Sequence, residues 1–496
     1  MFENAELGHK VDKDTYDREA PEVRAALLEA QRELAGSDLS VVVIVTGVGG
    51  AGKSEAVNLL LEWLDARGIE THAMQKPSGE ERRRPPMWRF WRDLPPRGRM
   101  AISFGAWYAQ PLLDRVFGRS GRPELDQSLD RIVELEQMLR REGVLLVKFW
   151  LHLSRDAQKV RIRRLEADPR QRWRVFKRDW KLFRRYDAYR SVGEHMLRRT
   201  GDGEAPWTII EGTDRRYCHL TVARALLDAL RSGLDRAGAG RPPEPEPEPD
   251  AAHAVPDAVN VINRLDLGLA LGPKAYKEEL PKAQGDLGLL TRRLRKEKRS
   301  LILVFEGPDA AGKGGAIRRI TAAMDARDYQ VITVAAPTDE ERARPYLWRF
   351  WRHLPPLGRV TIYDRSWYGR VLVERVEGFA RPDQWRRAYK EINGFEEQLT
   401  ESGAIVIKFW LAISPDEQLR RFRDRQETPY KQYKLTEEDW RNRDRWDAYE
   451  AAASEMIERT STEAVPWVLV EADNKEWARV KVLKAVVDGV EAALPG

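Results

Sequence analysis

The residues from Gly307 to Lys313 have the types and spacing expected of a phosphate-binding loop. They fit the pattern G-x-x-x-x-G-K and lie between an apolar run, 301–305, and a predicted helix that starts at Gly314. A strand, a glycine-rich loop and a helix in this order present free N–H groups and the positive end of the helix dipole to an anion. Gly307 and Gly312 permit backbone conformations that a Cβ would exclude, and Lys313 adds a positive charge. We therefore expect this loop, with Gly314 at the start of the helix, to bind phosphate.

Two features of this loop are unusual. Gly314 stands where a Ser or Thr hydroxyl would normally reach a magnesium ion, and Asp309 places a carboxylate inside the loop. A carboxylate beside a phosphate is repelled unless it ligates a metal ion or takes a proton from an attacking group. The sequence leaves two interpretations open, a special role for Asp309 or a degenerate loop with an incidental acid.

A second acid follows a neighbouring predicted strand. The stretch from Arg359 to Tyr363 has the pattern of a strand and is followed at once by Asp364 and Arg365. An acid at the carboxyl end of an adjacent strand is well placed to hold Mg²⁺, directly or through water, and a guanidinium can contact phosphate oxygens. We expect Asp309 and Asp364 to be metal ligands and Arg365 to contact phosphate.

The chain repeats itself at an offset of 260 residues, which is the separation of Lys53 and Lys313. The same offset aligns 41–54 with 301–314, 84–100 with 344–360, 143–154 with 403–414, and 205–212 with 465–472. A unit of roughly 200 residues is therefore duplicated in tandem, which differs from the short repeats of solenoid proteins.

The two copies differ in the residues that could carry chemistry. The first copy keeps the loop glycines, Lys53 and even Ser54, but Gly49 replaces Asp309, and Phe104 and Gly105 replace Asp364 and Arg365. The first copy can still bind an anion, but it lacks groups that would handle a metal ion or a proton. We expect catalysis in the second copy; the alternative is that both copies act, with Ser54 supplying the missing ligand.

A tract rich in Pro and Glu, RPPEPEPEPD at 241–250, separates the two copies. Such a tract cannot contribute to a core and is typical of an extended spacer. We expect an N-terminal unit at 1–235, a linker at 236–256 and a catalytic C-terminal unit at 257–496. The segment 255–299 is expected to form one or two helices beside the second unit, and its basic run at 292–296 is either a solvated face or a phosphate-facing patch.

Predicted strands alternate with predicted helices in each copy. In the second copy the strands are expected at 301–305, 359–363, 404–410 and 467–470, and the helices at 382–401, 415–427 and 437–459. This order, with a continuous apolar strand at 404–410, is typical of an α/β fold. Such folds have a parallel sheet with right-handed crossovers and bind ligands at the carboxyl ends of the strands.

Composition limits the class of protein. The 496 residues are too many for one core, and an apolar content of 42% suits globular domains. The 85 basic and 79 acidic residues nearly cancel to +6, which argues against a general nucleic-acid binder. The one cysteine, Cys218, excludes an internal disulfide, and no apolar run reaches 18 residues. We expect a cytoplasmic protein without membrane or nucleic-acid partners.

Aromatic and basic residues interleave in the W-R-F-W-R stretch at 348–352. The aromatic rings could stack on a base while the arginines hold phosphates, or the rings could pack in the core with the arginines at its rim. The copy that lacks the acids keeps the same stretch, which favours packing for the rings. We expect at least one of Arg344, Arg349 and Arg352 to contact an anion.

Cations are concentrated between residues 418 and 439. They are Arg420, Arg421, Arg423, Arg425, Lys431 and Lys434. A mobile basic lid that closes over phosphates and excludes water would have this composition. A solvated helix is the alternative.

These stretches together resemble polyphosphate kinase family 2. The resemblance rests on GPDAAGKGG at 307–315, YDRSWYGRVLVERVEGF at 363–379, IKFWLAIS at 407–414 and TPYKQYKL at 428–435. The duplication is similar to the two-domain branch of that family, and the match covers 10–235 and 257–496. The resemblance implies a tandem pair of P-loop kinase-like, three-layer α/β/α units, each with a helical lid.

The resemblance also implies roles for individual residues. Asp309, Lys313, Asp364 and Arg365 match the family's catalytic positions, and Arg425 matches its lid arginine, although Arg421 and Arg423 fit that position too. The further residues implied to contact substrate are Glu374, Lys431 and Lys434. The first copy departs from the family pattern at Gly49, Phe104 and Gly105.

The activity implied by the resemblance is transfer of the terminal phosphoryl group of inorganic polyphosphate to AMP, giving ADP, with Mg²⁺ as cofactor. Two other classes stay open, an ATP-dependent nucleoside monophosphate kinase and a non-catalytic polyphosphate- or nucleic-acid-binding protein. The sequence does not decide between AMP, ADP and GMP, nor the favoured direction, the role of the N-terminal unit, or whether the chain forms a homo-oligomer.

Overall fold

The computed structural model describes residues 1–74, 76–201, 203–239, 261–429 and 435–494. The chain divides into two compact units. Unit 1 consists of Met1–Pro77, Arg89–Pro242 and Pro337–Trp348, and unit 2 of Ser78–Trp88, Pro243–Ala336 and Arg349–Gly496. Most of the expected linker, including the tract at 241–250, lies outside the described residues. Among the helices within these ranges, none has the length and apolar character needed to cross a membrane.

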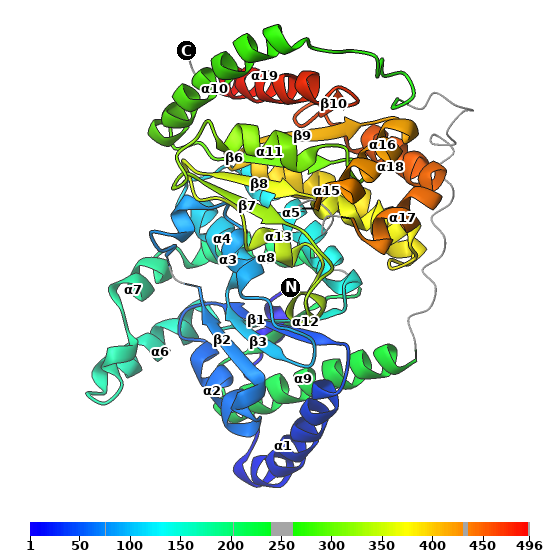
Figure 1. The fold of residues 1–496 in the computed structure, drawn as a ribbon. Helices are drawn as coiled ribbons and strands as arrows, with labels where there is room; N and C mark the ends of the chain where they lie inside the picture. Colours follow the sequence, from blue (N-terminus) through cyan, green and yellow to red (C-terminus); the bar gives the residue numbers. More distant parts are fainter. Residues whose placement is uncertain (75, 202, 240–260, 430–434, 495–496) are drawn as a thin grey trace. The chain divides into compact units, whose positions relative to one another are not determined.

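Each unit is built on a five-stranded sheet whose strands all pair in parallel (Figure 1). The strand order is β2-β3-β1-β4-β5 in unit 1 and β10-β9-β6-β8-β7 in unit 2. The strands of unit 1 are β1 (Ser40–Gly47), β2 (Ile69–Ala73), β3 (Met100–Phe104), β4 (Val144–His152) and β5 (Trp207–Glu211). Those of unit 2 are β6 (Leu301–Glu306), β7 (Tyr329–Thr333), β8 (Val360–Asp364), β9 (Ile405–Ala412) and β10 (Trp467–Glu471).

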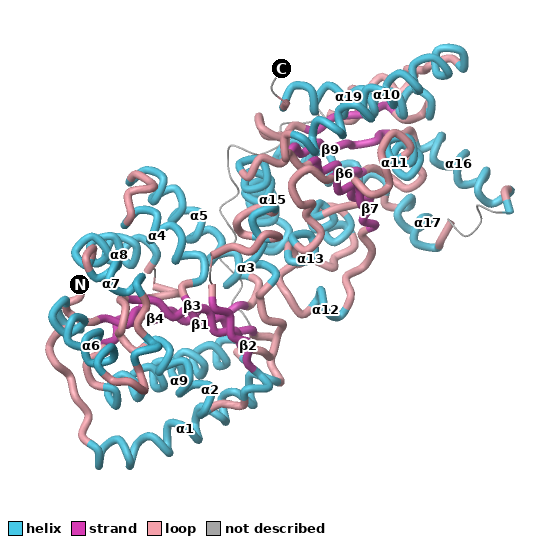
Figure 2. Tube along the Cα trace, turned by 90° about the vertical axis from the view of Figure 1, so that its left-hand side faces the viewer, coloured by secondary structure: helices cyan, strands magenta, loops and turns pink. Residues whose placement is uncertain are grey.

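Helices cover both faces of each sheet (Figure 2). The helices up to residue 238 are α1 (Lys13–Ala35), α2 (Lys53–Trp63), α3 (Trp88–Arg92), α4 (Ala109–Val116), α5 (Arg122–Arg141), α6 (Arg155–Ala167), α7 (Lys177–Phe183), α8 (Tyr186–Thr200) and α9 (Arg215–Gly238). In unit 1, α1 and α2 pack with α9 on one face of the sheet, while α4 and α8 pack with α5 on the other. The expected three-layer α/β/α architecture is confirmed. Because α9 continues to Gly238, it includes the first residues of the segment expected as a linker.

Unit 2 repeats this arrangement with residues mostly from the second half of the chain, although residues 337–348, which include α12, belong to unit 1. The helices after residue 260 are α10 (Pro273–Lys296), α11 (Lys313–Thr321), α12 (Asp339–Arg342), α13 (Trp348–Trp351), α14 (Val373–Val376), α15 (Pro382–Glu401), α16 (Pro415–Glu427), α17 (Glu437–Asp444), α18 (Trp446–Thr460) and α19 (Lys475–Ala493). Helices α10 and α11 pack with α19 on one face of the sheet, and α15 packs with α18 on the other. The helices predicted at 382–401 and 415–427 have the same bounds as α15 and α16.

Two predictions about elements need correction. The edge strands β2 and β7 were not expected, because their residues are all exposed or half-buried and form no continuous apolar run. The helix expected at 437–459 is two helices, α17 and α18. The break falls at Arg445, whose φ of −108° and ψ of 26° lie outside the α-helical region. The Arg445 guanidinium donates to the carbonyl oxygen of Val376 at 2.9 Å.

The rings of the W-R-F-W-R stretch pack in the core. This is the alternative that the sequence favoured, because both copies keep the stretch. Trp348, Phe350 and Trp351 are all buried. Within unit 2, the Trp351 ring packs edge-on against Phe395, with centroids 5.1 Å apart, and the Phe350 ring packs edge-on against Trp367 at 5.8 Å. The rings therefore stabilise the sheet and α15 and are not free to stack on a base.

A buried ion-pair network anchors the turn that follows β8. The Lys408 ammonium on β9 donates to Glu396 Oε2 on α15 and to the carbonyl oxygen of Thr460, both at 2.7 Å. The Trp367 indole and the Tyr368 hydroxyl donate to the other Glu396 oxygen at 3.0 and 2.7 Å. Unit 1 keeps the same network around Lys148 and Glu136. The network therefore belongs to the scaffold that both copies share.

We expect Lys408→Met to destabilise unit 2 by roughly 3–5 kcal/mol, because it leaves the Glu396 carboxylate buried without its cation. Hydrogen exchange followed by mass spectrometry reads the two units separately, and faster exchange is expected in peptides from β9 and α15. Lys148→Met is the matched variant and should produce the same effect in unit 1. If hydrogen exchange in unit 2 were unchanged in the Lys408→Met variant, the Lys408–Glu396 ion pair would contribute nothing to the stability of unit 2.

Candidate active site

The glycine loop joins β6 to α11 in the conformation that its sequence predicts. Gly307 has a φ of 143°, and a Cβ there would lie 2.5 Å from the carbonyl oxygen of Leu411. Gly312 has a φ of 107° and caps the first turn of α11. The Lys313 ammonium folds back over the loop and donates to the carbonyl oxygens of Gly307 and Pro308 at 2.6 and 3.1 Å. The backbone therefore forms the cradle that phosphate binding requires.

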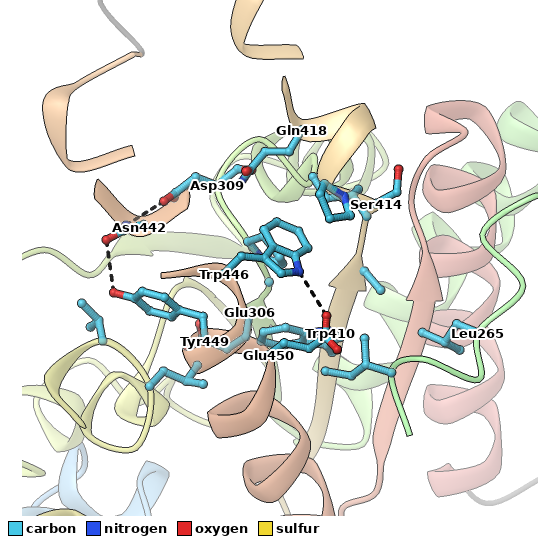
Figure 3. Close-up of a pocket in the computed structure, with 18 of the residues that line it drawn as sticks. Leu265, Glu306, Asp309, Trp410, Ser414, Gln418, Asn442, Trp446, Tyr449 and Glu450 are labelled. Carbon is cyan, nitrogen blue, oxygen red and sulfur yellow. Dashed lines mark hydrogen bonds between the residues drawn. The ribbon is translucent and has the colours of Figure 1, made fainter. Parts of the chain in front are cut away.

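Asp309 is held by side chains from three separate elements. Arg365, directly after β8, donates to its Oδ1 at 2.6 Å, and Asn442 on α17 donates to its Oδ2 at 2.8 Å. Gln418 on α16 donates to its carbonyl oxygen at 3.0 Å. Figure 3 shows Asn442 between Asp309 and Tyr449, whose hydroxyl donates to the Asn442 oxygen at 3.1 Å. The loop acid is thus fixed in orientation and is not incidental to the structure.

Electrostatics keep Asp309 ionised. Burial alone would raise the pKa of the Asp309 carboxyl, but the positive charges of Arg365 and Lys313 and the Asn442 hydrogen bond outweigh burial and lower it. Burial and the nearby Arg365 lower the pKa of Lys313, against the attraction of Asp309 and Asp364. The site therefore holds alternating positive and negative groups at the carboxyl ends of β6 and β8.

Backbone strain is concentrated at this site. Arg365 and Ala310 both have a φ of 63°, in the left-handed region that residues with a Cβ rarely adopt. Unit 1 has Gly105 and Gly50 at the equivalent positions, with φ values of 74° and 78°. Each non-glycine residue in this region costs of the order of 1–2 kcal/mol. Unit 2 tolerates this cost at Arg365, which is consistent with a functional need for its guanidinium.

Asp364 is the last residue of β8 and is paired in register with Phe305 of β6 and Thr333 of β7. Within the part of the chain that the structure describes, its carboxylate has no hydrogen bond or ion pair with another side chain. It is nevertheless close enough to Lys313 to attract the ammonium electrostatically. A half-buried carboxylate that the fold leaves uncommitted is available to a ligand.

One buried acid near the loop was missed by sequence reasoning. Glu306, the last residue of β6, accepts a hydrogen bond from the Ser366 hydroxyl at 2.8 Å. Its burial raises the pKa of the carboxyl, and the Ser366 hydrogen bond and the nearby Lys313 and Arg365 only partly offset this. Unit 1 has Thr46 at this position.

Arg421, expected to contact substrate, is engaged with the protein itself in this structure. Its guanidinium is buried and donates to the carbonyl oxygens of Ala310 and Ala311 at 2.8 and 3.0 Å. The same group donates to the carbonyl oxygens of Ala472 and Asp473 and to the Glu417 carboxylate. All its donors are committed to the protein, so Arg421 links the glycine loop to the end of β10.

The other expected lid and substrate residues are placed as follows. Arg423 and Arg425 lie on α16, and Lys431 and Lys434 lie outside the described residues. Glu374 on α14 forms an ion pair with Arg370 at 2.7 Å. Arg349 donates to the carbonyl oxygen of Ala335 at 3.0 Å, and Arg352 is exposed. The structure thus gathers Asp309, Lys313, Asp364 and Arg365 around the loop, and it gives Glu374 and Arg349 protein partners.

Unit 1 keeps the cradle and its lysine but lacks the acids and the arginine of unit 2. Lys53 donates to the carbonyl oxygens of Gly47 and Val48 at 2.9 and 2.6 Å, as Lys313 does in its own loop. The aspartate and the two side chains that bind its carboxylate are absent together: Gly49, Gly105 and Leu182 stand at the positions of Asp309, Arg365 and Asn442. Comparing the copies at the 260-residue offset would have revealed Asn442, which no short motif contains.

The fold and the loop together define a P-loop kinase-like protein with two α/β/α units. The chain belongs to the polyphosphate kinase 2 family, since the model of that family, Polyphosphate kinase 2 (PPK2), matches residues 10–236 and 270–495. The chain is 53% identical to a polyphosphate:AMP phosphotransferase of Pseudomonas aeruginosa, over 99% of both chains. It is 38% identical to a polyphosphate:AMP phosphotransferase of Acinetobacter johnsonii, over 91% of each.

A solved structure agrees with this assignment. A crystal structure described as a polyphosphate kinase 2 from Pseudomonas aeruginosa superposes with a TM-score of 0.89, at 51% identity and over 99% of both chains. The duplicated architecture is therefore shared along the whole length and not only by one unit.

Proposed function

We propose that the protein transfers the terminal phosphoryl group of inorganic polyphosphate to AMP, giving ADP and a polyphosphate chain one unit shorter. A phosphate oxygen of AMP attacks the terminal phosphorus, and the bond from that phosphorus to its bridging oxygen breaks. The shortened polyphosphate leaves with that oxygen. The observation that supports phosphoryl transfer is the Asp309–Arg365 ion pair beside the glycine loop that ends at Lys313. The choice of substrates rests on the full-length relatives that carry this activity in their names.

Unit 2 is the proposed catalytic unit. Lys313 and Arg365 would offset the charge that spreads over the transferring phosphoryl group, which is the main work of a protein in such reactions. Asp309, ionised and oriented by Arg365 and Asn442, would position the attacking phosphate oxygen or receive its proton. Arg425 and Arg423 on α16 would contact the polyphosphate, as would Lys431 and Lys434, which lie outside the described residues.

Asp309 and Asp364 fit the requirements of a magnesium ion. Mg²⁺ is commonly held by one or two carboxylates together with substrate phosphates and water. The Asp364 carboxylate has no side-chain partner among the described residues, and Asp309 is kept ionised, so both offer oxygen ligands beside the loop. When bound, Mg²⁺ would reduce the repulsion between the donor and acceptor phosphates. We propose that these two residues hold it.

The test is to incubate the full chain with AMP, polyphosphate and Mg²⁺ in the absence of ATP. ADP formation matched by loss of polyphosphate phosphoryl groups is the expected result. ADP that appears only when ATP is supplied would identify an ATP-dependent nucleoside monophosphate kinase instead. Binding of polyphosphate without turnover would identify a binding protein. Either of the last two outcomes would overturn the proposal.

A further inference from the structure

The α6–α7 hairpin of unit 1, residues 155–185, carries more net positive charge than the whole chain does. It contains 13 basic and 4 acidic residues, a net charge of +9, whereas the chain as a whole has +6. Helix α6 packs against α7 and against the 3₁₀ helix Arg172–Arg174 that lies between them (Figure 1). The positive charge is therefore concentrated on one compact part of unit 1.

The corresponding hairpin of unit 2, residues 415–445, has the same length but not the same charge. It contains 9 basic and 8 acidic residues, a net charge of +1. Three cations of unit 1 stand where unit 2 has acids: Arg164, Lys177 and Arg178 correspond to Asp424, Glu437 and Glu438. Because α16 and α17 form with those acids in place, the shared fold does not itself require the cations of unit 1.

The protein neutralises some of the hairpin cations and leaves others uncompensated. Arg161 and Arg174 both form ion pairs with the Glu55 carboxylate on α2, and the Arg161 pair measures 3.1 Å. Six other cations are exposed, and within the described part of the chain their side chains have no hydrogen bond or ion pair. We call these six the basic surface: Arg163, Arg164, Arg170, Arg172, Lys177 and Arg178.

The basic surface is electrostatically unfavourable to the protein on its own. Neighbouring like charges repel one another, and Lys177 and Arg178 occupy the first turn of α7, where the helix dipole favours acids. The Trp173 indole donates to the carbonyl oxygen of Arg170 at 3.0 Å and so holds the turn that presents Arg170 and Arg172. A ligand with many negative charges would turn this unfavourable arrangement into a favourable one.

We propose that the basic surface is a docking site for inorganic polyphosphate on the non-catalytic unit; the choice of polyphosphate rests on the proposed function. A linear polyphosphate carries a negative charge on every unit and attracts counterions, which a row of protein cations can replace. A chain held on unit 1 keeps its ends concentrated around the same molecule, which raises its effective concentration at unit 2. Since Trp173 and Phe176 on this hairpin are exposed and could stack on bases, single-stranded nucleic acid is the competing occupant.

The test replaces three cations with the acids that unit 2 carries at the same positions. The variant Arg164→Asp/Lys177→Glu/Arg178→Glu should fold, because all three side chains are exposed and acids suit the first turn of α7 better than cations. Binding of long-chain polyphosphate to the full chain is measured by isothermal titration calorimetry at several salt concentrations. We expect affinity to fall by at least about tenfold, and the slope of log Kd against log salt concentration to decrease by about 2 to 3.

A matched control reverses three exposed cations elsewhere in unit 1. The variant Lys13→Glu/Arg32→Glu/Arg231→Glu, on α1 and α9, changes the net charge by the same amount as the hairpin variant. It should keep the affinity and the salt dependence of the unsubstituted chain. An equal loss in this control would reduce the effect to overall charge and would overturn the proposal.

Steady-state kinetics distinguish docking from a role in catalysis. The hairpin variant should keep its kcat, because the residues around the loop of unit 2 are untouched. Its KM should rise for long-chain polyphosphate but not for short-chain polyphosphate, since a short chain has too few charges to be held on unit 1 while it reacts. A fall in kcat, or an equal rise in both KM values, would contradict a separate docking site.

Two binding results would also overturn the proposal. One is an unchanged affinity of the hairpin variant for long-chain polyphosphate. The other is single-stranded RNA that binds the unsubstituted chain more tightly than polyphosphate does and loses this affinity in the hairpin variant, which would make the basic surface a nucleic-acid site.

This test is separable from that of the proposed function. If the chain binds polyphosphate through the basic surface but makes no ADP from it, the docking site stands and the proposed function fails. If the chain makes ADP from AMP and polyphosphate but the hairpin variant binds and reacts as the unsubstituted chain does, the proposed function stands and the docking site fails.

Discussion

Lys313→Met is expected to lower the rate of ADP formation from AMP and polyphosphate by about 10²- to 10³-fold, the loss typical of removing one group that stabilises transition-state charge. Lys313 is the cation of the glycine loop in unit 2, where Asp309, Asp364 and Arg365 are also found. Steady-state kinetics at saturating AMP measure the effect on kcat.

The same substitution in unit 1 provides a matched control. Lys53 makes the same two hydrogen bonds to its own loop carbonyls, so Lys53→Met removes the same structural contacts. Unit 1 lacks the acids and the arginine, and we therefore expect Lys53→Met to leave kcat unchanged. If Lys313→Met and Lys53→Met lowered kcat equally, both units would be catalytic, and the assignment of catalysis to unit 2 alone would be wrong.

The second large effect is expected from Asp364→Asn. Because the described fold gives the Asp364 carboxylate no hydrogen bond or ion pair, its removal should change the free energy of unfolding by less than about 1 kcal/mol. The rate of ADP formation should nevertheless fall by about 10²- to 10³-fold, the scale for losing one electrostatic contact in the transition state. Thermal unfolding and steady-state kinetics of the same preparation test both parts.

A loss of activity without a loss of stability is what would distinguish Asp364→Asn from a variant of a structural residue. A purely structural residue would lose both, as we expect for Lys408→Met in its buried network. Turnover of Asp364→Asn close to that of the unsubstituted chain would remove Asp364 from the site, and a loss of stability as large as the loss of activity would make its role structural.

Local patterns were sufficient to predict the parts of the fold that short stretches of sequence determine. The glycine loop, α15, α16 and the central strands follow from glycine positions, apolar runs and helix-start residues that act over a few residues. The edge strands were missed because solvent on one side removes the continuous apolar run. The break between α17 and α18 falls at Arg445, which contacts Val376 far away in the sequence, and local patterns do not reveal such a contact.

The candidate site shows the same limit. Asp309 could be predicted because it lies inside the glycine loop motif. Asp364 could be predicted because it directly follows the predicted strand at 359–363. The role of Arg421 could not be predicted, because a run of arginines does not reveal which one turns inward to bind backbone carbonyls. Asn442 lies in a stretch without a motif, so its contact with Asp309 appears only in the structure, although the 260-residue offset shows that the first copy has Leu182 at this position.

The central claim is that Asp309 and Asp364 of unit 2 act together, as two ligands of one magnesium ion would. A double-mutant cycle with Asp309→Asn, Asp364→Asn and the combined variant tests it most directly, with kcat/KM for AMP as the measured quantity. Groups that act as a unit are strongly non-additive, so the combined variant should be no more than about tenfold slower than the worse single variant. Losses that multiply to about 10⁴- to 10⁶-fold would show that the two carboxylates act independently and would contradict the shared site.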